Sequence, residues 1–479
     1  MRKNSAVLRL GFIPTRRGMS GEKAFNREVA LKEKRAILDY IRRYPIEIVD
    51  LEGINEDGML YDGLQTEEAA RRMIAANVEA LFAPHCNFGC EDAVAKVAAR
   101  VNRPLLLWGP GGETVDSEGY RYRDSQCGLF ATSKVLQRVG VPFSYITSCR
   151  LEDATFQQGF ANFIRAASAA KMLRHARIGQ ISLRPNAFWS VQVNEAELLE
   201  QFGIETVPLT LKELEAAFQQ ARSDTSAVQQ IVKEIRSGVC GVHFPQEALE
   251  RAAALEIAVK RWADENQLDA AATNCWAPMF QATGLAPCLS LSRLSDQGFP
   301  TICECDLHGA ISSLLAYGAV MGDSSTFLAD ITIRHPSVPN RELLWHCGVF
   351  PMSMCGDAIC PTLEEHYNRK APAVNHFELK KGDVTLTRFD GVRGKYSLLI
   401  GECRVAEGPE TLGTYGWMDF HDWPLWEHRL IYGPYIHHCA GTYGKYASAL
   451  YEACRFIPGL IPDPVEPSEQ EIQKALRGE

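Results

Sequence analysis

Short apolar runs alternate with longer amphipathic segments through the first third of the chain. The runs are rich in Leu, Ile, Val and Ala and are typical of buried strands, whereas apolar residues in the intervening segments recur every three or four positions, as in helices. The pattern predicts strands at 6–13, 46–51, 80–84 and 104–108 and helices at 23–43, 67–75 and 91–101. This alternation indicates a parallel sheet covered by helices on both faces.

The same alternation restarts after a long amphipathic segment at 154–173. A strand is predicted at 176–183, followed by helices at 195–201, 211–219 and 246–266. We therefore expect a Rossmann-like α/β domain over 1–172 and a second α/β domain over 173–325, each built on a doubly wound parallel sheet.

Beyond 325 the apolar positions follow a different period. Residues 376–389 and 394–403 alternate apolar and polar side chains, with Gly-Asp and Asp-Gly turns between them, which predicts antiparallel strands. A last helix with one apolar stripe is predicted at 446–455. We expect a β-rich, barrel-like C-terminal domain over 326–479.

Composition and charge narrow the class of protein. The 479 residues are 46% hydrophobic and 23% charged, as in globular proteins, and 59 acidic against 50 basic residues give a net charge of −9. No cluster of Lys or Arg offers a site for nucleic acid, and no apolar run approaches the ~20 residues of a membrane helix. Fifteen scattered cysteines, several in apolar segments, are typical of free thiols in a reducing compartment. We expect a cytoplasmic protein whose partner is a small molecule.

Four polar residues stand in or beside apolar, strand-like segments of the second half of the chain: Glu304, Asp330, His346 and His438. Charged and imidazole side chains are costly to bury there without a partner. Oxygen and nitrogen donors that converge on one point suit a hard or borderline divalent metal. The pattern therefore predicts a metal site.

Glu304 belongs to a run in which Glu304, Asp306 and His308 would share one face of a strand before Gly309 turns the chain into a helix. Such a strand end is where open α/β sheets bind ligands. For Asp306 and His308 the alternative to a functional role is capping of that helix.

Two of the other three candidates also have structural alternatives. Asp330 could form a buried ion pair with Arg334, and His346 taken alone is more often a satisfied core histidine than a ligand. The His437-His438 pair is more specific, because it precedes a Gly-Thr-Tyr-Gly turn where irregular backbone exposes side chains.

Substrate contacts are suggested by residues near predicted strand ends: Arg16, Trp108 in a Gly-rich loop, Arg184 and His437. They could meet the distal end of a substrate, including an anionic group such as a 6-sulfonate or a carboxylate. Solvated surface arginines are the commoner outcome.

Over about 270–460 the chain resembles the L-fucose isomerase and L-arabinose isomerase superfamily, enzymes that interconvert aldoses and ketoses using manganese. The resemblance rests on motifs that occur in order at 284–290, 294–298, 303–310, 328–330, 346–348 and 438–444. It implies two Rossmann-like domains, a β-rich C-terminal domain, and a trimer or hexamer with active sites near subunit contacts.

The resemblance also implies roles for individual residues. In fucose-type enzymes the metal ligands fall on Glu304, Asp330 and His438, and in arabinose-type enzymes a further histidine falls near His346; the two carboxylates are the proton acceptor and donor. The implied metal is Mn²⁺, with Co²⁺ or Mg²⁺ as alternatives.

The expected reaction is aldose–ketose isomerisation of an open-chain sugar through a cis-enediolate, an intramolecular oxidoreduction. A metal that chelates O1 and O2 would stabilise the developing negative charge. The identity of the sugar is left open, and the candidates include deoxy and 6-substituted, for example sulfonated, forms. The alternative functions are a metal-dependent sugar lyase or epimerase, and a non-catalytic sugar-binding protein.

Overall fold

The computed structural model describes residues 7–478, which form two compact units. The N-terminal unit contains 7–171 together with 470–478, and the larger unit contains 172–469. The second boundary predicted from the sequence, at 325, lies inside the larger unit.

The N-terminal unit is built on one parallel sheet with the strand order β2-β1-β3-β4-β5. The strands are β1 (Leu8–Phe12), β2 (Ile46–Val49), β3 (Ala80–Pro84), β4 (Leu105–Trp108) and β5 (Phe143–Tyr145). The helices are α1 (Arg27–Ile41), α2 (Thr66–Ala75), α3 (Glu91–Val101), α4 (Ser125–Arg138), α5 (Ala154–Leu173) and, from the C-terminus, α15 (Glu469–Ala475). This is the doubly wound arrangement that the alternating pattern predicted.

The larger unit begins with a second parallel sheet, in the order β10-β9-β6-β7. Its strands are β6 (Arg177–Ile181), β7 (Glu205–Leu209), β9 (Ala270–Thr273) and β10 (Thr301–Ile302). The chain winds outward in opposite directions from β6 and β9. The carboxyl ends of these two strands therefore open a crevice of the kind in which α/β sheets bind ligands.

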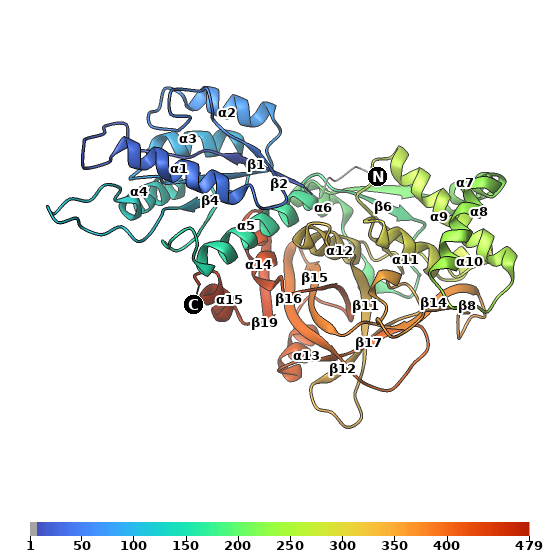
Figure 1. Ribbon diagram of the computed structural model, residues 1–479. Helices are drawn as coiled ribbons and strands as arrows, with labels where there is room; N and C mark the ends of the chain where they lie inside the picture. The colour runs from blue at the N-terminus through green and yellow to red at the C-terminus, as the bar shows by residue number, and fades with distance from the viewer. Residues whose placement is uncertain (1–6, 479) are drawn as a thin grey trace. The chain divides into compact units, whose positions relative to one another are not determined.

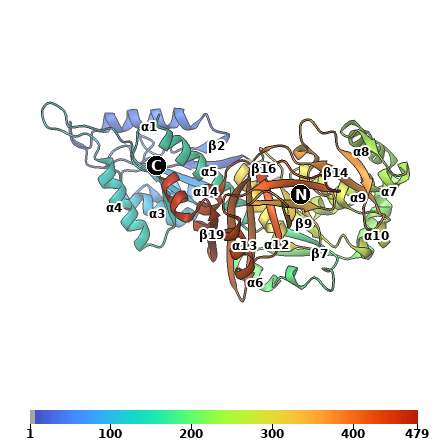
Figure 2. The same ribbon diagram turned by 90° about the horizontal axis from the view of Figure 1, so that it is seen from below.

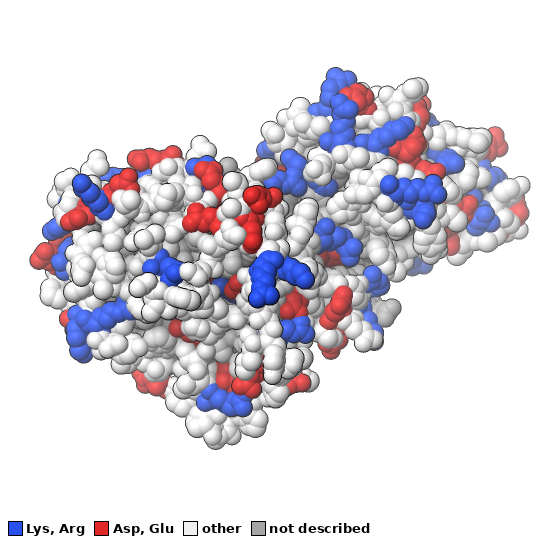
Figure 3. Space-filling view, turned by 180° about the vertical axis from the view of Figure 1, so that it is seen from behind, with Lys and Arg blue, Asp and Glu red and all other residues white. Residues whose placement is uncertain are grey.

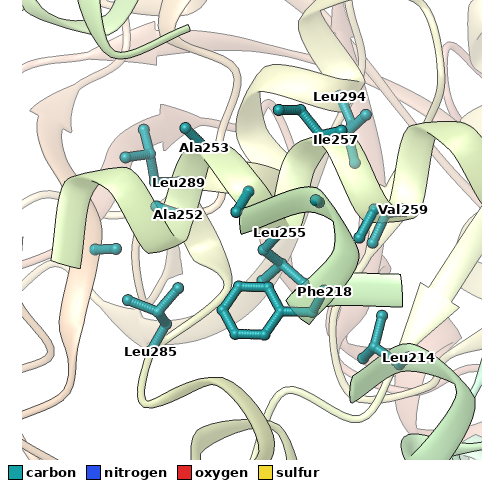
Figure 4. Packing of buried hydrophobic residues seen from close by; sticks show 14 of the residues in the cluster. Leu214, Phe218, Ala252, Ala253, Leu255, Ile257, Val259, Leu285, Leu289 and Leu294 are labelled. Atoms are coloured by element: carbon teal, nitrogen blue, oxygen red, sulfur yellow. The ribbon is translucent and has the colours of Figure 1, made fainter. Parts of the chain in front are cut away.

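Helices and an apolar core cover this sheet. They are α6 (Glu195–Phe202), α7 (Leu211–Ser223), α8 (Thr225–Ser237), α9 (Gln246–Glu265), α10 (Ala277–Thr283) and α11 (Cys288–Asp296), with the short η1 (Trp189–Val191) before α6. Figure 4 shows Phe218 of α7 packed beside Leu255 of α9, with Leu285 and Leu289 also close to α9.

A closed antiparallel barrel follows. Its strands are β11 (Phe327–Arg334), β12 (Arg341–His346), β15 (Gly382–Val392), β16 (Lys395–Ala406), β17 (Thr414–Asp419) and β18 (His438–Tyr443), and the pairing of β16 with β17 closes it. The sheet extends through β14 (Pro372–Glu378), β13 (Thr362–Glu365) and β8 (Gly241–Val242) on one side and β19 (Leu460–Glu466) on the other. The remaining elements are η2 (Met352–Met354), α13 (Trp423–Tyr432) and α14 (Ala447–Arg455). The predicted fold class, two doubly wound sheets and a barrel-like C-terminal part, is confirmed.

Helix α12 (Leu307–Val320) joins the second sheet to the barrel. It contacts β6, β9 and β10 on one side and β11, β15 and β18 on the other, and nearly all of its residues are buried (Figures 1 and 2). A helix that is apolar on every side is stable only in such an enclosed position. The turn that precedes α12 is therefore held between the two sheets.

Two of the fifteen cysteines are not the free thiols that the sequence predicted. Cys240, beside β8, forms a disulfide with Cys360, beside β13, with a Cα–Cα distance of 5.7 Å. The other thirteen cysteines are free, and most are buried. The expectation of free thiols is therefore wrong for this pair and confirmed for the rest.

The surface agrees with the charge balance of the sequence. On the face drawn in Figure 3, Lys and Arg side chains are interspersed with Asp and Glu. Every helix in the described part of the chain is too short or too polar to cross a lipid bilayer.

Candidate metal centre

The turn between β10 and α12 carries Glu304 in an unusual backbone conformation. Glu304 and Cys305 have φ angles of 61° and 56°, in the left-handed region that costs a residue with a side chain roughly 1–2 kcal/mol. The predicted strand is therefore wrong beyond Ile302, and Glu304, Asp306 and His308 do not share a strand face. Such strain persists where surrounding structure holds the residue in place for a function.

Asp330 and His438 face one another across two barrel strands. They are directly paired in the antiparallel register of β11 and β18, and the Nε2 nitrogen of His438 lies 3.3 Å from Oδ1 of Asp330. The same nitrogen lies 3.2 Å from Oε2 of Glu304. The turn before α12 and the barrel thus bring the three predicted ligands together.

The structural alternative for Asp330 is excluded by its neighbour. Arg334 pairs instead with Glu342, at 2.9 Å, and with Glu427, at 3.5 Å.

His346 and His437 complete the cluster. The donor atoms of Glu304, Asp330 and His346 all lie within 4.8 Å of one another, and so do those of Asp330, His437 and His438. His346 ends β12 in the barrel core, whereas His437 is exposed. The four predicted metal donors and His437, which was predicted as a substrate contact, therefore lie in two overlapping groups that share Asp330.

A buried carboxylate orients the His438 ring. Its Nδ1–H donates to Oδ2 of Asp306 at 2.9 Å, which leaves Nε2 directed at Glu304 and Asp330. A carboxylate behind a histidine in this way is the usual support of a metal-binding imidazole. Asp306 also caps α12 by accepting a hydrogen bond from the Gly309 N–H at 2.9 Å. It therefore has both of the roles weighed for it, helix cap and site residue.

Asp306 is in turn held by a charged network without exposed surface. Arg388 of β15 donates to both oxygens of Asp306 and to Asp390 at 2.9 Å, and Nδ1 of His308 donates to Asp390, also at 2.9 Å. Because each charge has an opposite partner, the network can stay ionised inside the protein. His308 therefore contacts the cluster only through Asp390 and Arg388 and is not one of its donors.

The pKa values follow from these contacts. Burial would raise the pKa of Glu304, but contact with His438 and the charges of His346 and His438 outweigh it and lower the pKa to about 2. Burial would lower the pKa of His438, but Asp306 and Glu304 raise it to about 10. At neutral pH Glu304 is therefore ionised, and His438 carries a proton that a bound cation would displace.

The cluster fits a divalent cation. Asp330 Oδ1, His346 Nε2 and His438 Nε2 are buried atoms that have no hydrogen-bond partner among the described residues. Buried polar atoms without partners are rare in proteins and call for an ion or a ligand. Two carboxylates and an imidazole are donors suited to Mn²⁺, Co²⁺ or Mg²⁺.

His346 has a distinct hydrogen-bonding state. Its Nδ1 accepts the backbone N–H of Cys347 at 2.9 Å, so the hydrogen of the neutral ring is on Nε2. In this form the Nε2–H lies near Glu304 and Asp330 without a hydrogen-bond partner among the described residues, and ligation by Nε2 would require moving that hydrogen.

An aromatic wall that the sequence did not reveal borders the cluster. Phe188, in the segment after β6, has its ring centroid 5.5 Å from that of His438 and 6.1 Å from that of Trp276, which follows β9. The Nε1–H of Trp276 donates to Oε1 of Glu304 at 3.0 Å. The cluster thus lies at the carboxyl ends of β6, β9 and β10, as the sheet order predicts. For Phe188, the position just beyond the strand predicted at 176–183 was the available signal; for Trp276 no predicted element gave one.

The predicted substrate contacts are distributed over both units. Arg184, in the same segment as Phe188, donates to the carbonyls of Pro185 and Asn186. Arg16 and Trp108 belong to the N-terminal unit, where Arg16 pairs with Asp57 at 2.6 Å and Trp108 packs in the core against Phe156. Substrate contact by these residues stays a prediction.

Comparison with known proteins gives consistent matches. The family model described as fucose/sulfoquinovose isomerase, N-terminal domain, matches residues 11–174. The sulfoquinovose isomerase of Priestia aryabhattai is 27% identical over 379 residues, which cover 77% of this chain and 82% of that protein. Those of Alkalicoccus urumqiensis and Clostridium sp. (strain MSTE9) are 26% and 22% identical and cover 70% and 69% of this chain and 74% and 73% of their own length.

Proposed function

The chain belongs to the fucose/arabinose isomerase-like superfamily, and from this premise we propose that it is a metal-dependent aldose–ketose isomerase of a sulfonated sugar. The observation that carries the proposal is the convergence of Glu304, Asp330 and His438 on one point, with buried donor atoms that lack partners among the described residues. The sulfonated substrate is supported by relatives named sulfoquinovose isomerase that match over most of their length.

Glu304, Asp330 and His438 would hold the cation, with Mn²⁺ as the first candidate. When bound, the cation would act as a Lewis acid for the sugar oxygens on C1 and C2. Asp306 keeps His438 in the required tautomer, and Trp276 fixes the second oxygen of Glu304. These groups are in place before a substrate arrives, as efficient electrostatic stabilisation requires.

The carboxylates would move the proton. One of them takes the hydrogen on C2 as a proton, which leaves a cis-enediolate, and returns it to C1, while a proton passes from the C2 hydroxyl to the oxygen on C1. No atom is gained or lost, so the aldose becomes its ketose isomer. Glu304 is available to accept the proton because it is ionised at neutral pH.

We also propose that the protein is a homo-oligomer, a trimer or hexamer, and that it works in the cytoplasm. The superfamily resemblance supports the first statement. Light scattering of the purified chain would test it, and a monomer would contradict it.

Isomerisation is tested with protein stripped by EDTA and incubated with sulfoquinovose, L-fucose or L-arabinose in D₂O, with and without Mn²⁺. We expect NMR to show a ketose only when metal is present and to show none with Glu304→Gln. Glu215→Gln, on the exposed face of α7, is the matched control and should keep full activity. Cleavage products or a C2 epimer would identify a lyase or an epimerase, and sugar binding without conversion would identify a binding protein.

A further inference from the structure

A turn between β13 and β14 carries an arginine to the edge of the metal centre. The Cζ atom of Arg369 lies 5.4 Å from the centroid of the Trp276 ring, and its Nη1–H donates to the carbonyl of Cys275 at 3.1 Å. Trp276 is also the residue that donates to Glu304. One indole ring therefore separates the guanidinium of Arg369 from a predicted metal ligand.

The charge of Arg369 is not neutralised within the part of the chain that the structure describes. No carboxylate of residues 7–478 lies within 4.0 Å of its guanidinium, whereas Arg388, Arg334 and Arg293 of the same unit all have acidic partners. The side chain is exposed and uses one of its five N–H groups in the contact with Cys275. A planar guanidinium with free donors, steadied by an aromatic face, is suited to bidentate binding of an anion.

His366 holds the turn that carries Arg369. Its Nδ1 accepts the backbone N–H groups of Asn368 and Arg369, at 3.2 and 3.3 Å, so the hydrogen of the neutral ring is on Nε2. The ring is 3% exposed, and Nε2 has no hydrogen-bond partner among the described residues. Burial, with the charges of Arg369 and His346, lowers the pKa of His366 to about 4, so the ring is a neutral donor at pH 7.

We propose that Arg369, in the turn braced by His366, binds the sulfonate of the substrate and thereby selects sulfonated over uncharged sugars. The inference rests on the proposed isomerase function and names the residue that recognises the anionic end. With C1 and C2 at the cluster of Glu304, Asp330 and His438, an extended six-carbon chain places the sulfur roughly 7 Å from C1, at about 1.2 Å per bond. That reach is comparable with the length of the indole between Glu304 and Arg369.

The chemistry of the two groups is complementary. A sulfonate is ionised at every physiological pH and presents three acceptor oxygens, and arginine is always protonated. An uncharged sugar would leave the guanidinium unpaired and gain nothing from it. Discrimination should therefore arise from one charge-assisted contact far from the reacting carbons, and it should appear mainly in KM.

The test compares sulfoquinovose with 6-deoxy-D-glucose, which has a hydrogen in place of the sulfonate. We expect Arg369→Gln to lower kcat/KM for sulfoquinovose about 10- to 100-fold, the value of a hydrogen bond to a charged group, and to leave kcat/KM for 6-deoxy-D-glucose within about twofold. Arg369→Lys should keep part of the preference. Arg404→Gln, at an exposed position on β16, is the matched control and should leave kcat/KM unchanged for both sugars.

The possible failures are distinguishable. If the wild-type protein isomerises neither sugar, the proposed function is wrong. If it isomerises sulfoquinovose and Arg369→Gln changes the ratio of the two kcat/KM values by less than about twofold, the assignment of Arg369 is wrong. The melting temperatures of both Arg369 variants identify a loss of folding, and the conservative Arg369→Lys variant then decides the question.

Discussion

The Nδ1 nitrogen of His438 lies 2.9 Å from Oδ2 of Asp306, a carboxylate without exposed surface. The two residues are 132 positions apart, and their contact joins the cap of α12 to the first residue of β18. It fixes the hydrogen of the imidazole on Nδ1 and leaves Nε2 free for a cation. The end of the second sheet and the wall of the barrel thus share one site.

We predict that Asp306→Asn weakens Mn²⁺ binding about 10- to 100-fold, because the ring loses the partner that sets its tautomer and basicity. The same change leaves Arg388 with one partner fewer inside the protein, and we expect it to cost about 3 kcal/mol of unfolding free energy. Titration calorimetry with Mn²⁺ and urea unfolding measure the two effects separately.

Asp390→Asn is the matched control for this prediction. Asp390 contacts Arg388 and His308 but not His438, so its loss should lower stability and leave Mn²⁺ affinity within a few-fold of wild type. Equal losses of affinity in the two variants would contradict a specific role of Asp306.

The two buried histidines are expected to differ in metal binding. His438→Gln should abolish tight Mn²⁺ binding, because Asp306 holds the Nδ1–H of His438 and leaves Nε2 as the atom that would bind the cation once its proton is displaced. His346→Gln should keep Mn²⁺ affinity within about tenfold and lower kcat, because the ring holds its hydrogen on Nε2, facing the carboxylates. Calorimetry and steady-state kinetics separate the two effects, and an equal loss of affinity in both variants would make His346 a fourth ligand.

Much of the fold could be predicted from the sequence because it depends on local periodicity. Strand 80–84 and helix 91–101 have the predicted bounds, the amphipathic segment 154–173 is a helix, and the order of elements indicated both parallel sheets. The predicted metal ligands could be chosen for a related reason. Charged and imidazole groups are costly inside apolar strands, so their presence there was itself the signal of a site.

Other features depend on contacts between distant segments and left no local signal. Neither Glu304 nor Cys305 is a residue that favours positive φ, so the end of β10 at Ile302 could not be predicted. Arg388 occupies an ordinary strand position, and only the fold places Asp306 beside it. Arg369 lies far from Trp276 in the sequence, and only the fold brings the two side chains together.

The N-terminal unit should lose stability in acid through His85. This ring has no exposed surface; Nδ1 donates to the carbonyl of Ala83 at 3.3 Å, and Nε2 accepts from Thr132 at 2.8 Å. Burial lowers its pKa to about 4, against an ordinary value near 6.5. Below pH 6.5 the unfolded chain therefore binds a proton that the folded chain does not.

Stability should accordingly be unaffected by His85 above pH 6.5 and fall by up to about 3 kcal/mol between pH 6.5 and 4. Hydrogen exchange of the β3 amides as a function of pH measures this decline. It should become shallower in His85→Gln and stay unchanged in His428→Gln, where the histidine is exposed. A decline of the same slope in both variants would assign the acid sensitivity to other groups.

Gly309 provides a steric test of the contact between Asp306 and His438. Replacing glycine by alanine inside a helix ordinarily stabilises it by about 1 kcal/mol. Here a Cβ atom would come within 2.6 Å of Oδ2 of Asp306, the oxygen that accepts from His438, and within 3.0 Å of Leu328 in β11. Because Asp306 is held by Arg388 and cannot withdraw freely, we expect Gly309→Ala to lower the unfolding free energy by about 1–3 kcal/mol and to weaken Mn²⁺ binding. Thermal unfolding and calorimetry measure both effects, and a variant with a raised melting temperature and unchanged affinity would show that the carboxylate can shift without disturbing His438.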